Sequence, residues 1–333
     1  MSVTTMQTEK QAGTEHNLVL GTVCGIGAGA LWGLVFLAPE LVRAFTPLQL
    51  AVGRYLAYGA LSAALIAPRW QRLLFTVKRQ DWAALFWLSL FGNTLYYILL
   101  SMAVQAGGIA LTSLVLGFLP VTVTLIGSRD KGAAPLGVLL PSLLCCAAGA
   151  VCIGWQAIAT PGASNNAVTG LIYALAALIS WTAYAVGNSR CLMRLPTVSI
   201  HDWNLLVGLV TGAQAVLLLP VVLLSGHLQY STLQWGQFGA VSLAVAVIAS
   251  LVGNALWNRM SRLVPLTMTG QMILFETLFA LIYGFLWEER WPRPLEIAAF
   301  GLLVLSVLTC VSGHQKQATK RQKALSALPE NGV

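Results

Sequence analysis

Apolar residues run along this chain in blocks long enough to cross a lipid bilayer, and short polar or Pro/Gly segments separate the blocks. One helical crossing needs about 20 mostly apolar residues. With charges, prolines and glycines taken as block ends, the pattern predicts ten transmembrane helices, at residues 18–40, 47–67, 82–104, 108–128, 135–156, 167–188, 202–224, 235–258, 265–287 and 294–313. The sequence therefore predicts an all-α, multi-pass membrane protein.

The composition excludes a soluble domain of this size. Hydrophobic residues make up 57% of the 333 residues and charged residues only 9%, whereas soluble domains carry about 25% charged residues. The net charge of +8 does not predict a nucleic-acid partner, because the Lys and Arg residues lie in loops and tails. The lipid bilayer is the expected environment.

The distribution of positive charge predicts the orientation of the chain. Fifteen Lys and Arg residues fall in the tails and on one side of the predicted helices, whereas the opposite loops hold only Arg43, Arg290 and Arg293. Cytoplasmic loops carry the excess of positive charge. Both termini are therefore expected in the cytoplasm, which requires an even number of crossings.

An internal repeat divides the chain into two halves. The octapeptide SLFGNTLY at 89–96, in the third predicted helix, matches SLVGNALW at 250–257, in the eighth, with five of eight residues identical. The predicted units are a tail at 1–17, five helices at 18–156, a connecting loop at 157–166, five helices at 167–313 and a basic tail at 314–333.

The spacing of the repeat predicts an inverted topology. Corresponding helices are five apart, and because five is odd, the second copy must enter the membrane from the opposite side. Inverted repeats are typical of secondary transporters, whose substrate sites lie between the repeats near the bilayer midplane. The sequence therefore predicts a carrier with a small-molecule substrate.

Two ionisable residues lie inside predicted helices, where charge is costly and often functional. Glu276 is flanked by apolar residues in the ninth helix, where it could bind a substrate amine or couple transport to protons. Alternatively, it pairs with Arg54 as a structural bridge. For Arg54 itself we expect a position near the outer end of the second helix, with the guanidinium reaching the interface.

Polar and aromatic side chains mark further candidate binding residues. Asn93, with Tyr96 and Tyr97 one turn later, and Asn254, with Trp257 one turn later, form stripes suited to lining a wet cavity. Interhelical hydrogen bonding is the alternative for these stripes.

Three aromatic residues lie at membrane depth, although Trp in lipid usually prefers the interface. Trp32, Trp181 and Tyr184 are therefore candidate pocket walls, with ordinary packing as the alternative. Gln271 is a weaker binding candidate. Gly33 and Pro120 are candidate gating positions that could loosen their helices, although Gly33 also ends a stripe of glycines that indicates a close helix contact.

Motifs for other kinds of chemistry are missing from the sequence. There is no GxxxxGK[ST] loop, no HExxH, no G-x-S-x-G and no lysine inside a predicted helix, as ATP-driven pumps, membrane hydrolases and retinal proteins would need. The six cysteines show no metal-ligand spacing. We therefore expect no catalytic residues, no metal, no cofactor and no enzymatic activity.

The chain resembles the drug/metabolite transporter superfamily, specifically its EamA-type members. The residues that carry the resemblance are the region of Trp32, then Arg54, Pro120, Trp181, and the Glu288-Glu289-Arg290 turn that leads into Pro294. The chain departs from the family pattern at Glu276, which stands where a second proline paired with Pro120 is usual. Within the superfamily it is most similar to bacterial YddG-type exporters of aromatic amino acids.

This resemblance implies two inverted halves of five helices, and a bacterial inner-membrane exporter with a cavity that opens alternately to each side. The sequence analysis thus predicts a secondary transporter that exports amino acids, aromatic or otherwise apolar, or similar metabolites. A multidrug or sugar-phosphate carrier of the same fold, and less favoured an intramembrane enzyme or receptor, are the alternatives. The substrate, the transport direction, the coupling ion and the oligomeric state stay open, although a monomer is compatible with the sequence.

Overall fold

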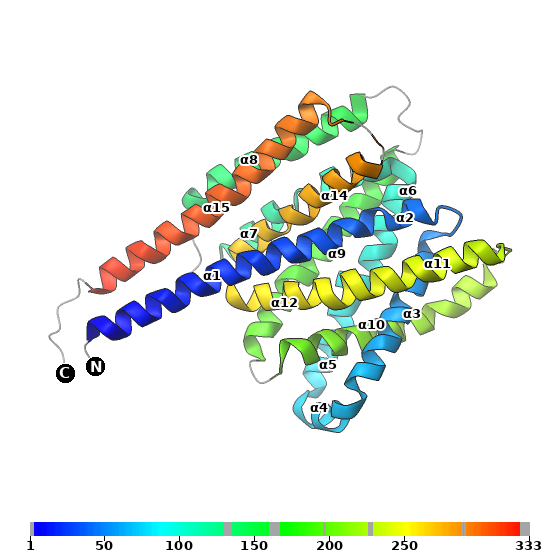
Figure 1. Cartoon of the computed structure of the whole chain (residues 1–333), viewed down its shortest axis with the longest axis horizontal. Helices are drawn as coiled ribbons and strands as arrows, with labels where there is room; N and C mark the ends of the chain where they lie inside the picture. The colour runs from blue at the N-terminus through cyan, green and yellow to red at the C-terminus, as the bar shows by residue number, and fades with distance from the viewer. Residues whose placement is uncertain are drawn as a thin grey trace.

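The computed structural model describes residues 3–129, 135–159, 167–195, 198–225, 229–287, 289 and 291–326, and the regular structure among them is helical (Figure 1). The predicted connecting loop 157–166 and the Glu288-Glu289-Arg290 turn lie largely outside these residues. The helices are α1 Val3–Gly33, α2 Ala38–Leu41, α3 Pro47–Ile66, α4 Trp70–Thr76, α5 Arg79–Ser89, α6 Leu95–Leu116, α7 Leu119–Gly127, α8 Leu136–Ala159, α9 Ala167–Arg194, α10 Ile200–Leu224, α11 Thr232–Val245, α12 Asn254–Leu263, α13 Leu266–Met272, α14 Leu274–Trp287 and α15 Pro294–Ser326.

Eight helical segments of the described chain are long and apolar enough to cross a membrane. They are Asn17–Leu41, Pro47–Leu73, Arg79–Ile109, Val168–Arg194, Ile200–Leu224, Thr232–Leu263, Leu266–Trp287 and Pro294–Gln317. The other two predicted crossings are also helical: 108–128 falls on the end of α6 and on α7, and 135–156 on α8. Ten crossings stay a prediction, since the first of these segments is broken and the apolar part of the second, Leu136–Gly149, is short.

Local sequence explains several helix boundaries. The Thr46 hydroxyl accepts from the backbone N–H of Gln49 while the Gln49 side chain accepts from that of Thr46, and this capping box starts α3 just before Pro47. Gly108 has φ of 82° inside α6, a conformation open to glycine at little cost. It turns the chain between the third and fourth predicted crossings.

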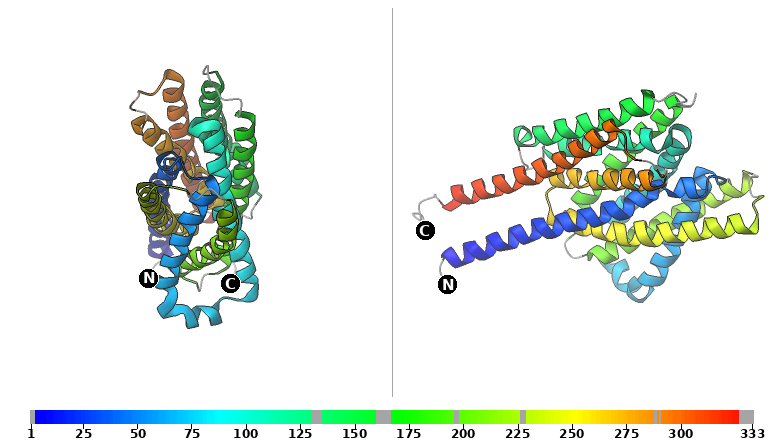
Figure 2. Two further views of the ribbon diagram at one scale, coloured as in Figure 1. Left: turned by 90° about the vertical axis from the view of Figure 1, so that its right-hand side faces the viewer. Right: turned by 45° about the horizontal axis from the view of Figure 1, so that its top comes forward.

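Helices from the two halves of the chain pack against each other in pairs, α3 on α10, α7 on α13, α8 on α15, α1 on α14 and α6 on α9. The α3–α10 crossing is especially close: a Cβ placed on Gly59 would lie 2.5 Å from the Cα of Gly212. The α8–α15 pair lies along one side of the bundle in Figures 1 and 2. One continuous apolar core joins most of these helices.

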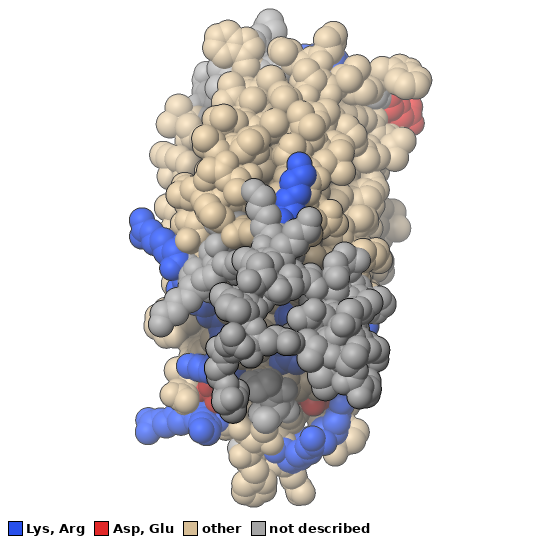
Figure 3. Space-filling view, turned by 90° about the vertical axis from the view of Figure 1, so that its left-hand side faces the viewer, with Lys and Arg blue, Asp and Glu red and all other residues tan. Residues whose placement is uncertain are grey.

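Both termini lie at the same end of the molecule (Figures 1 and 2), and Lys and Arg side chains gather on that end (Figure 3). Two ion pairs link helix ends there. Arg194 at the end of α9 contacts Asp81 of α5 at 2.8 Å, and Arg69 contacts Asp202 of α10 at 2.9 Å. This arrangement agrees with the predicted charge asymmetry, while the assignment of this end to the cytoplasm stays a prediction.

Candidate functional site

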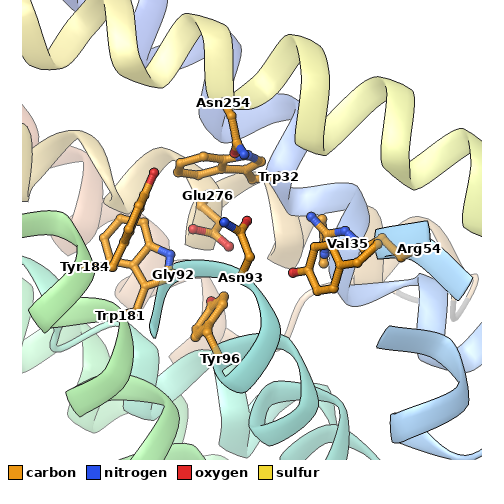
Figure 4. A pocket seen from close by; sticks show the side chains of 11 residues that line it. Trp32, Val35, Arg54, Gly92, Asn93, Tyr96, Trp181, Tyr184, Asn254 and Glu276 are labelled. Atoms are coloured by element: carbon orange, nitrogen blue, oxygen red, sulfur yellow. The ribbon is translucent and has the colours of Figure 1, made fainter. Parts of the chain in front are cut away.

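A polar cavity lies inside the bundle, surrounded by α1, α3, α6, α9, α12 and α14 (Figure 4). Three of its residues, Asn93, Trp181 and Glu276, lie near the middle of their membrane spans. The full lining is Trp32, Val35, Arg54, Tyr55, Gly92, Asn93, Tyr96, Trp181, Tyr184, Asn254 and Glu276. The structure therefore brings together seven of the ten predicted binding residues, Trp32, Asn93, Tyr96, Trp181, Tyr184, Asn254 and Glu276.

Two widened helical segments border the cavity. The third crossing is π-helical at η3, Leu90–Thr94, and the eighth at η4, Ala246–Gly253, so the widened turns fall within or beside the two matching octapeptides. A π-helical turn disturbs the regular hydrogen-bond ladder and is frequent at functional sites. Side chains from other helices donate hydrogen bonds to carbonyl groups of both widened turns. Ser180 Oγ donates to Phe91 O of η3 at 2.7 Å, and Trp32 Nε1 donates to Ala249 O of η4 at 3.1 Å.

The fourth and ninth crossings are broken at related places. The fourth is interrupted between α6 and α7, and Pro120 lies in the first turn of α7. The ninth is interrupted at Ile273 between α13 and α14, and Glu276 lies in the first turn of α14. The backbone at Ile273 keeps helical dihedral angles, φ −62° and ψ −29°, and the backbone N–H of Glu276 bonds to Ile273 O at 2.9 Å. The interruption at Ile273 is therefore a change of hydrogen-bond pattern within one continuing helical span.

A stripe of glycines on α1 brings that helix against the helix of Glu276. A Cβ added at Gly29 would lie 2.8 Å from the backbone nitrogen of Glu276, and one added at Gly33 would lie 2.9 Å from the backbone nitrogen of Ala280. Real Cβ atoms essentially never come so close. The structure confirms the close helix contact that the stripe indicated, while a gating role for Gly33 or Pro120 stays a prediction.

Arg54 is a correction to the sequence analysis, because its side chain does not reach the interface. The residue is only 6% exposed, and its Nε donates to Ser250 Oγ at 3.1 Å. Its guanidinium carbon lies 4.3 Å from the ring centroid of Tyr97 and 5.0 Å from that of Tyr55, within the range of cation–π attraction. The facing helix and these rings hold the cation inside the protein.

Arg54 and Glu276 line the same cavity but make no direct ion pair in the part of the chain that the structure describes. Figure 4 shows the Glu276 carboxyl and the Asn93 amide at the centre of the view, with Arg54 to one side. The structure therefore places a cation and a carboxyl group around one space without joining them. A structural bridge between the two is not what is observed.

Two hydrogen-bond donors at the cavity have no partner among the described groups. The Asn93 Nδ2 and the Tyr96 hydroxyl are both buried, and neither makes a hydrogen bond. An unpaired buried polar group costs about 1 to 3 kcal/mol, so such groups call for an explanation. A ligand with acceptor atoms would provide their partners.

Aromatic rings form the walls of the cavity. Trp32 and Trp181 meet edge to face with centroids 5.9 Å apart, and Trp181 meets Tyr184 at 5.6 Å. Trp257, a predicted binding residue, packs on Trp32 at 5.0 Å and is 1% exposed, so it supports the wall from behind. In Figure 4 the labelled rings surround Glu276 and Asn93.

Tyr97 and Gln271 are the other predicted binding residues that do not line the cavity. Tyr97 lies under the Arg54 guanidinium. Gln271 accepts a hydrogen bond from Ser306 Oγ at 3.1 Å and so joins α13 to α15. Both residues therefore make contacts between helices instead of lining the cavity. Arg54, Tyr55, Val35 and Gly92 are cavity residues that the sequence analysis did not place there.

The free volume between the lining side chains is about 30 Å³, which is room for roughly two waters and well below the volume of small-molecule pockets. A larger ligand therefore requires side chains or helices to move apart. Among the described residues, no group of three or more His, Cys, Asp or Glu could hold a metal ion.

Replacing Trp32 with phenylalanine is expected to lower the thermal stability of the protein. The change removes the indole donor to Ala249 O. Because the backbone N–H of Asn254 still bonds to that carbonyl, the expected cost is that of one hydrogen bond, about 0.5 to 1.5 kcal/mol. Thermal unfolding in detergent measures the effect. Trp181→Phe is the matched control, because it removes an indole for which no hydrogen bond is described. Equal shifts for the two variants would show that the bond to η4 is unimportant.

Comparison with known proteins relates the chain to a transporter family, to a bacterial inner membrane protein and to a solved structure. The model of the EamA-like transporter family matches residues 168–312. The chain is 31% identical over 316 residues to inner membrane protein YtfF of Escherichia coli strain K12, covering 88% of this chain and 95% of that protein. One solved structure aligns with a TM-score of 0.63 and 19% identity over 87% of this chain and 97% of the other. This last likeness shows that the fold is shared.

Proposed function

Because this chain belongs to the EamA-like transporter family, we propose that it exports zwitterionic amino acids with aromatic or other apolar side chains. The chain is a multi-pass protein of the inner membrane, as its relative is named an inner membrane protein and the described residues include eight apolar spans. The family points to a transporter of small molecules. The amino-acid substrate and the outward direction are the proposal.

The single observation that carries the proposal is that a carboxyl group, Glu276, and a guanidinium, Arg54, line the same cavity without bonding to each other in the described part of the chain. An α-amino acid carries an ammonium group and a carboxylate on the same carbon. Charge-assisted hydrogen bonds to a carboxylate and to a guanidinium are the strong ones in proteins. We assign the ammonium to Glu276 and the carboxylate to Arg54, with the unpaired donors of Asn93 and Tyr96 available to the carboxylate oxygens.

The aromatic walls suit an apolar side chain. Trp32, Trp181, Tyr184 and Tyr96 offer ring faces and edges at the cavity, and aromatic pairs gain about 0.5 to 1.5 kcal/mol beyond the area they bury. A phenylalanine, tryptophan or methionine side chain would meet apolar surface on several sides. A strongly polar side chain would find few partners there.

Alternating access is supported by features that the two halves share. Widened turns occur in the third and eighth crossings, and interruptions occur in the fourth and ninth. Discontinuous helices at corresponding places in two halves point to the binding site of an inverted-repeat transporter. We therefore propose that the two halves rearrange around the cavity and expose it to each side in turn.

The alternative substrates fit the cavity less well. A sugar phosphate would need several cations, yet Arg54 is the one Lys or Arg that lines the cavity in the described structure, and Glu276 would repel the phosphate. An organic cation would suit Glu276 and the rings but would meet Arg54. An enzyme or a receptor receives no specific support from the site.

Replacing Arg54 with glutamine is expected to weaken the binding of L-phenylalanine about 10- to 100-fold, because the carboxylate loses a charged partner worth about 1.5 to 3 kcal/mol. The binding of 2-phenylethylamine, which lacks the carboxylate, should not weaken. Competition against radiolabelled phenylalanine in proteoliposomes measures both.

Arg43→Gln is the control for this experiment, because Arg43 pairs with Glu40 on the surface. If Arg54→Gln weakened the amine and the amino acid equally in folded protein, Arg54 would not contact the carboxylate. Uptake of no amino acid by folded native protein would overturn the amino-acid proposal itself. Faster loss of preloaded phenylalanine from cells that overproduce the protein is the expected sign of export.

A further inference from the structure

A second hollow lies on the membrane-facing surface. The end of α1, the short helix η1 (Leu34–Phe36) and α2 form one side of it, and α11 with η4 forms the other. Its volume is about 190 Å³. All of its lining residues are apolar, among them Leu34, Val35 and Ala38 on the first side and Ala244, Val245 and Ile248 on the second. We call this hollow the lateral groove.

The lateral groove lies at membrane depth, because its walls belong to the spans Asn17–Leu41 and Thr232–Leu263. In Figure 1 these parts of α1, α2 and α11 lie in the half of the molecule away from the termini. Small side chains at Ala38 and Ala244 leave the space open. A groove without polar lining in this environment is filled by hydrocarbon rather than by water.

A thin wall separates the lateral groove from the polar cavity. Val35 lines both spaces. Ala249, which belongs to η4, lines the groove. Its carbonyl oxygen accepts a hydrogen bond from the indole of Trp32, and the Trp32 ring lines the cavity. Movement of one valine side chain and of the widened turn would therefore join the two spaces.

We propose that the lateral groove receives the alkyl tail of amphiphilic amino acids whose zwitterionic head lies between Arg54 and Glu276. This inference rests on the proposed function and extends the substrate class to long-chain α-amino acids, which reach the cavity sideways from the bilayer. Two surfaces on either side of Val35 support this proposal. The cavity offers charges of both signs to the head, and the lateral groove offers an apolar surface to the tail.

The proposal predicts how affinity depends on chain length. Each methylene that moves from water into an apolar site strengthens binding about fourfold. Short side chains stay inside the cavity, whereas longer ones displace Val35 and extend into the groove. Affinity, expressed against the free aqueous concentration, is therefore expected to keep rising from norvaline to 2-aminodecanoic acid instead of falling once the cavity is full.

The test uses purified full-length protein in lipid nanodiscs and the series alanine, norvaline, 2-aminooctanoic acid and 2-aminodecanoic acid, measured by competition against radiolabelled phenylalanine. Ala244→Trp fills the groove from α11, and Leu243→Trp is the matched control on the same helix, since Leu243 is exposed but lies outside the groove. Ala244→Trp should weaken 2-aminodecanoic acid about tenfold or more and leave norvaline unchanged. Leu243→Trp should change neither.

The outcomes separate this inference from the proposed function. If norvaline and phenylalanine bind but affinity stops rising with chain length, the groove holds only lipid tails and the inference is wrong. The inference is also wrong if the two tryptophan variants behave alike. If phenylalanine itself does not bind to folded protein, the proposed function fails first.

Discussion

Glu276→Gln is expected to remove most amino-acid transport, lowering the initial rate of phenylalanine uptake into proteoliposomes, at low substrate concentration, about 30- to 150-fold. Glutamine keeps the size of the side chain but loses the negative charge that we assign to the substrate ammonium. A hydrogen bond to a charged group is worth about 2 to 3 kcal/mol, which corresponds to this range of affinity. Glu276 is 6% exposed, so little water is available to replace the lost interaction.

The matched control for this prediction is Glu40→Gln, because Glu40 pairs with the exposed Arg43 and does not line the cavity. It should transport at the native rate. Thermal unfolding distinguishes a functional loss from misfolding, and Glu276→Gln should remain as stable as the native protein or become more stable, since a buried carboxyl group is costly. Native uptake by Glu276→Gln would show that this carboxyl does not hold the substrate.

Gly29→Ala is expected to disturb both stability and transport, although it adds only one methyl group. That methyl would lie 2.7 Å from the Phe275 carbonyl carbon and 2.8 Å from the Glu276 nitrogen. Backbone cannot swing aside as a side chain can, so α1 and α14 must separate. Overpacking of this kind costs about 1 to 3 kcal/mol, and the separation moves Glu276 relative to the α1 side of the cavity.

Gly27→Ala provides the comparison on the same helix. Its added methyl would meet only the Leu256 Cδ1, at 3.1 Å, and that is the far end of a flexible side chain. Thermal unfolding and phenylalanine uptake should therefore fall clearly in Gly29→Ala and little in Gly27→Ala. Similar behaviour of the two variants would contradict the close α1–α14 contact.

The sequence was sufficient for the positions of the eight apolar spans, because bilayer thickness dictates long apolar blocks and the breaks between them are marked by charges and by Gly or Pro. Gly107-Gly108 correctly marked the turn after the third crossing. The interruption at Ile273 carries no proline and no adjacent charge. It depends on tertiary contacts of α13 and α14 that a one-dimensional pattern does not contain.

The sequence predicted those cavity residues whose side-chain chemistry alone makes them unusual inside a membrane span. Glu276 and Asn93 are polar groups at mid-span, so their cost in the membrane drew attention to them. Arg54 was misplaced because its direction depends on partners from distant segments, Tyr97 and Ser250. Gln271 shows the reverse error, since its Ser306 partner on α15 turns a polar mid-helix residue into a helix contact.

The crossing of α3 and α10 has a consequence for movement. At Gly59 and Gly212 the two backbones touch with no side chain between them, and Tyr58, next to Gly59, donates a hydrogen bond to Asn204 O of α10 at 2.8 Å. The crossing therefore joins a helix of the first half to a helix of the second at a fixed separation, and under the proposed alternating access α3 and α10 would move together as one rigid pair. Bulk added at either glycine should therefore push the two helices apart and break the bond from Tyr58.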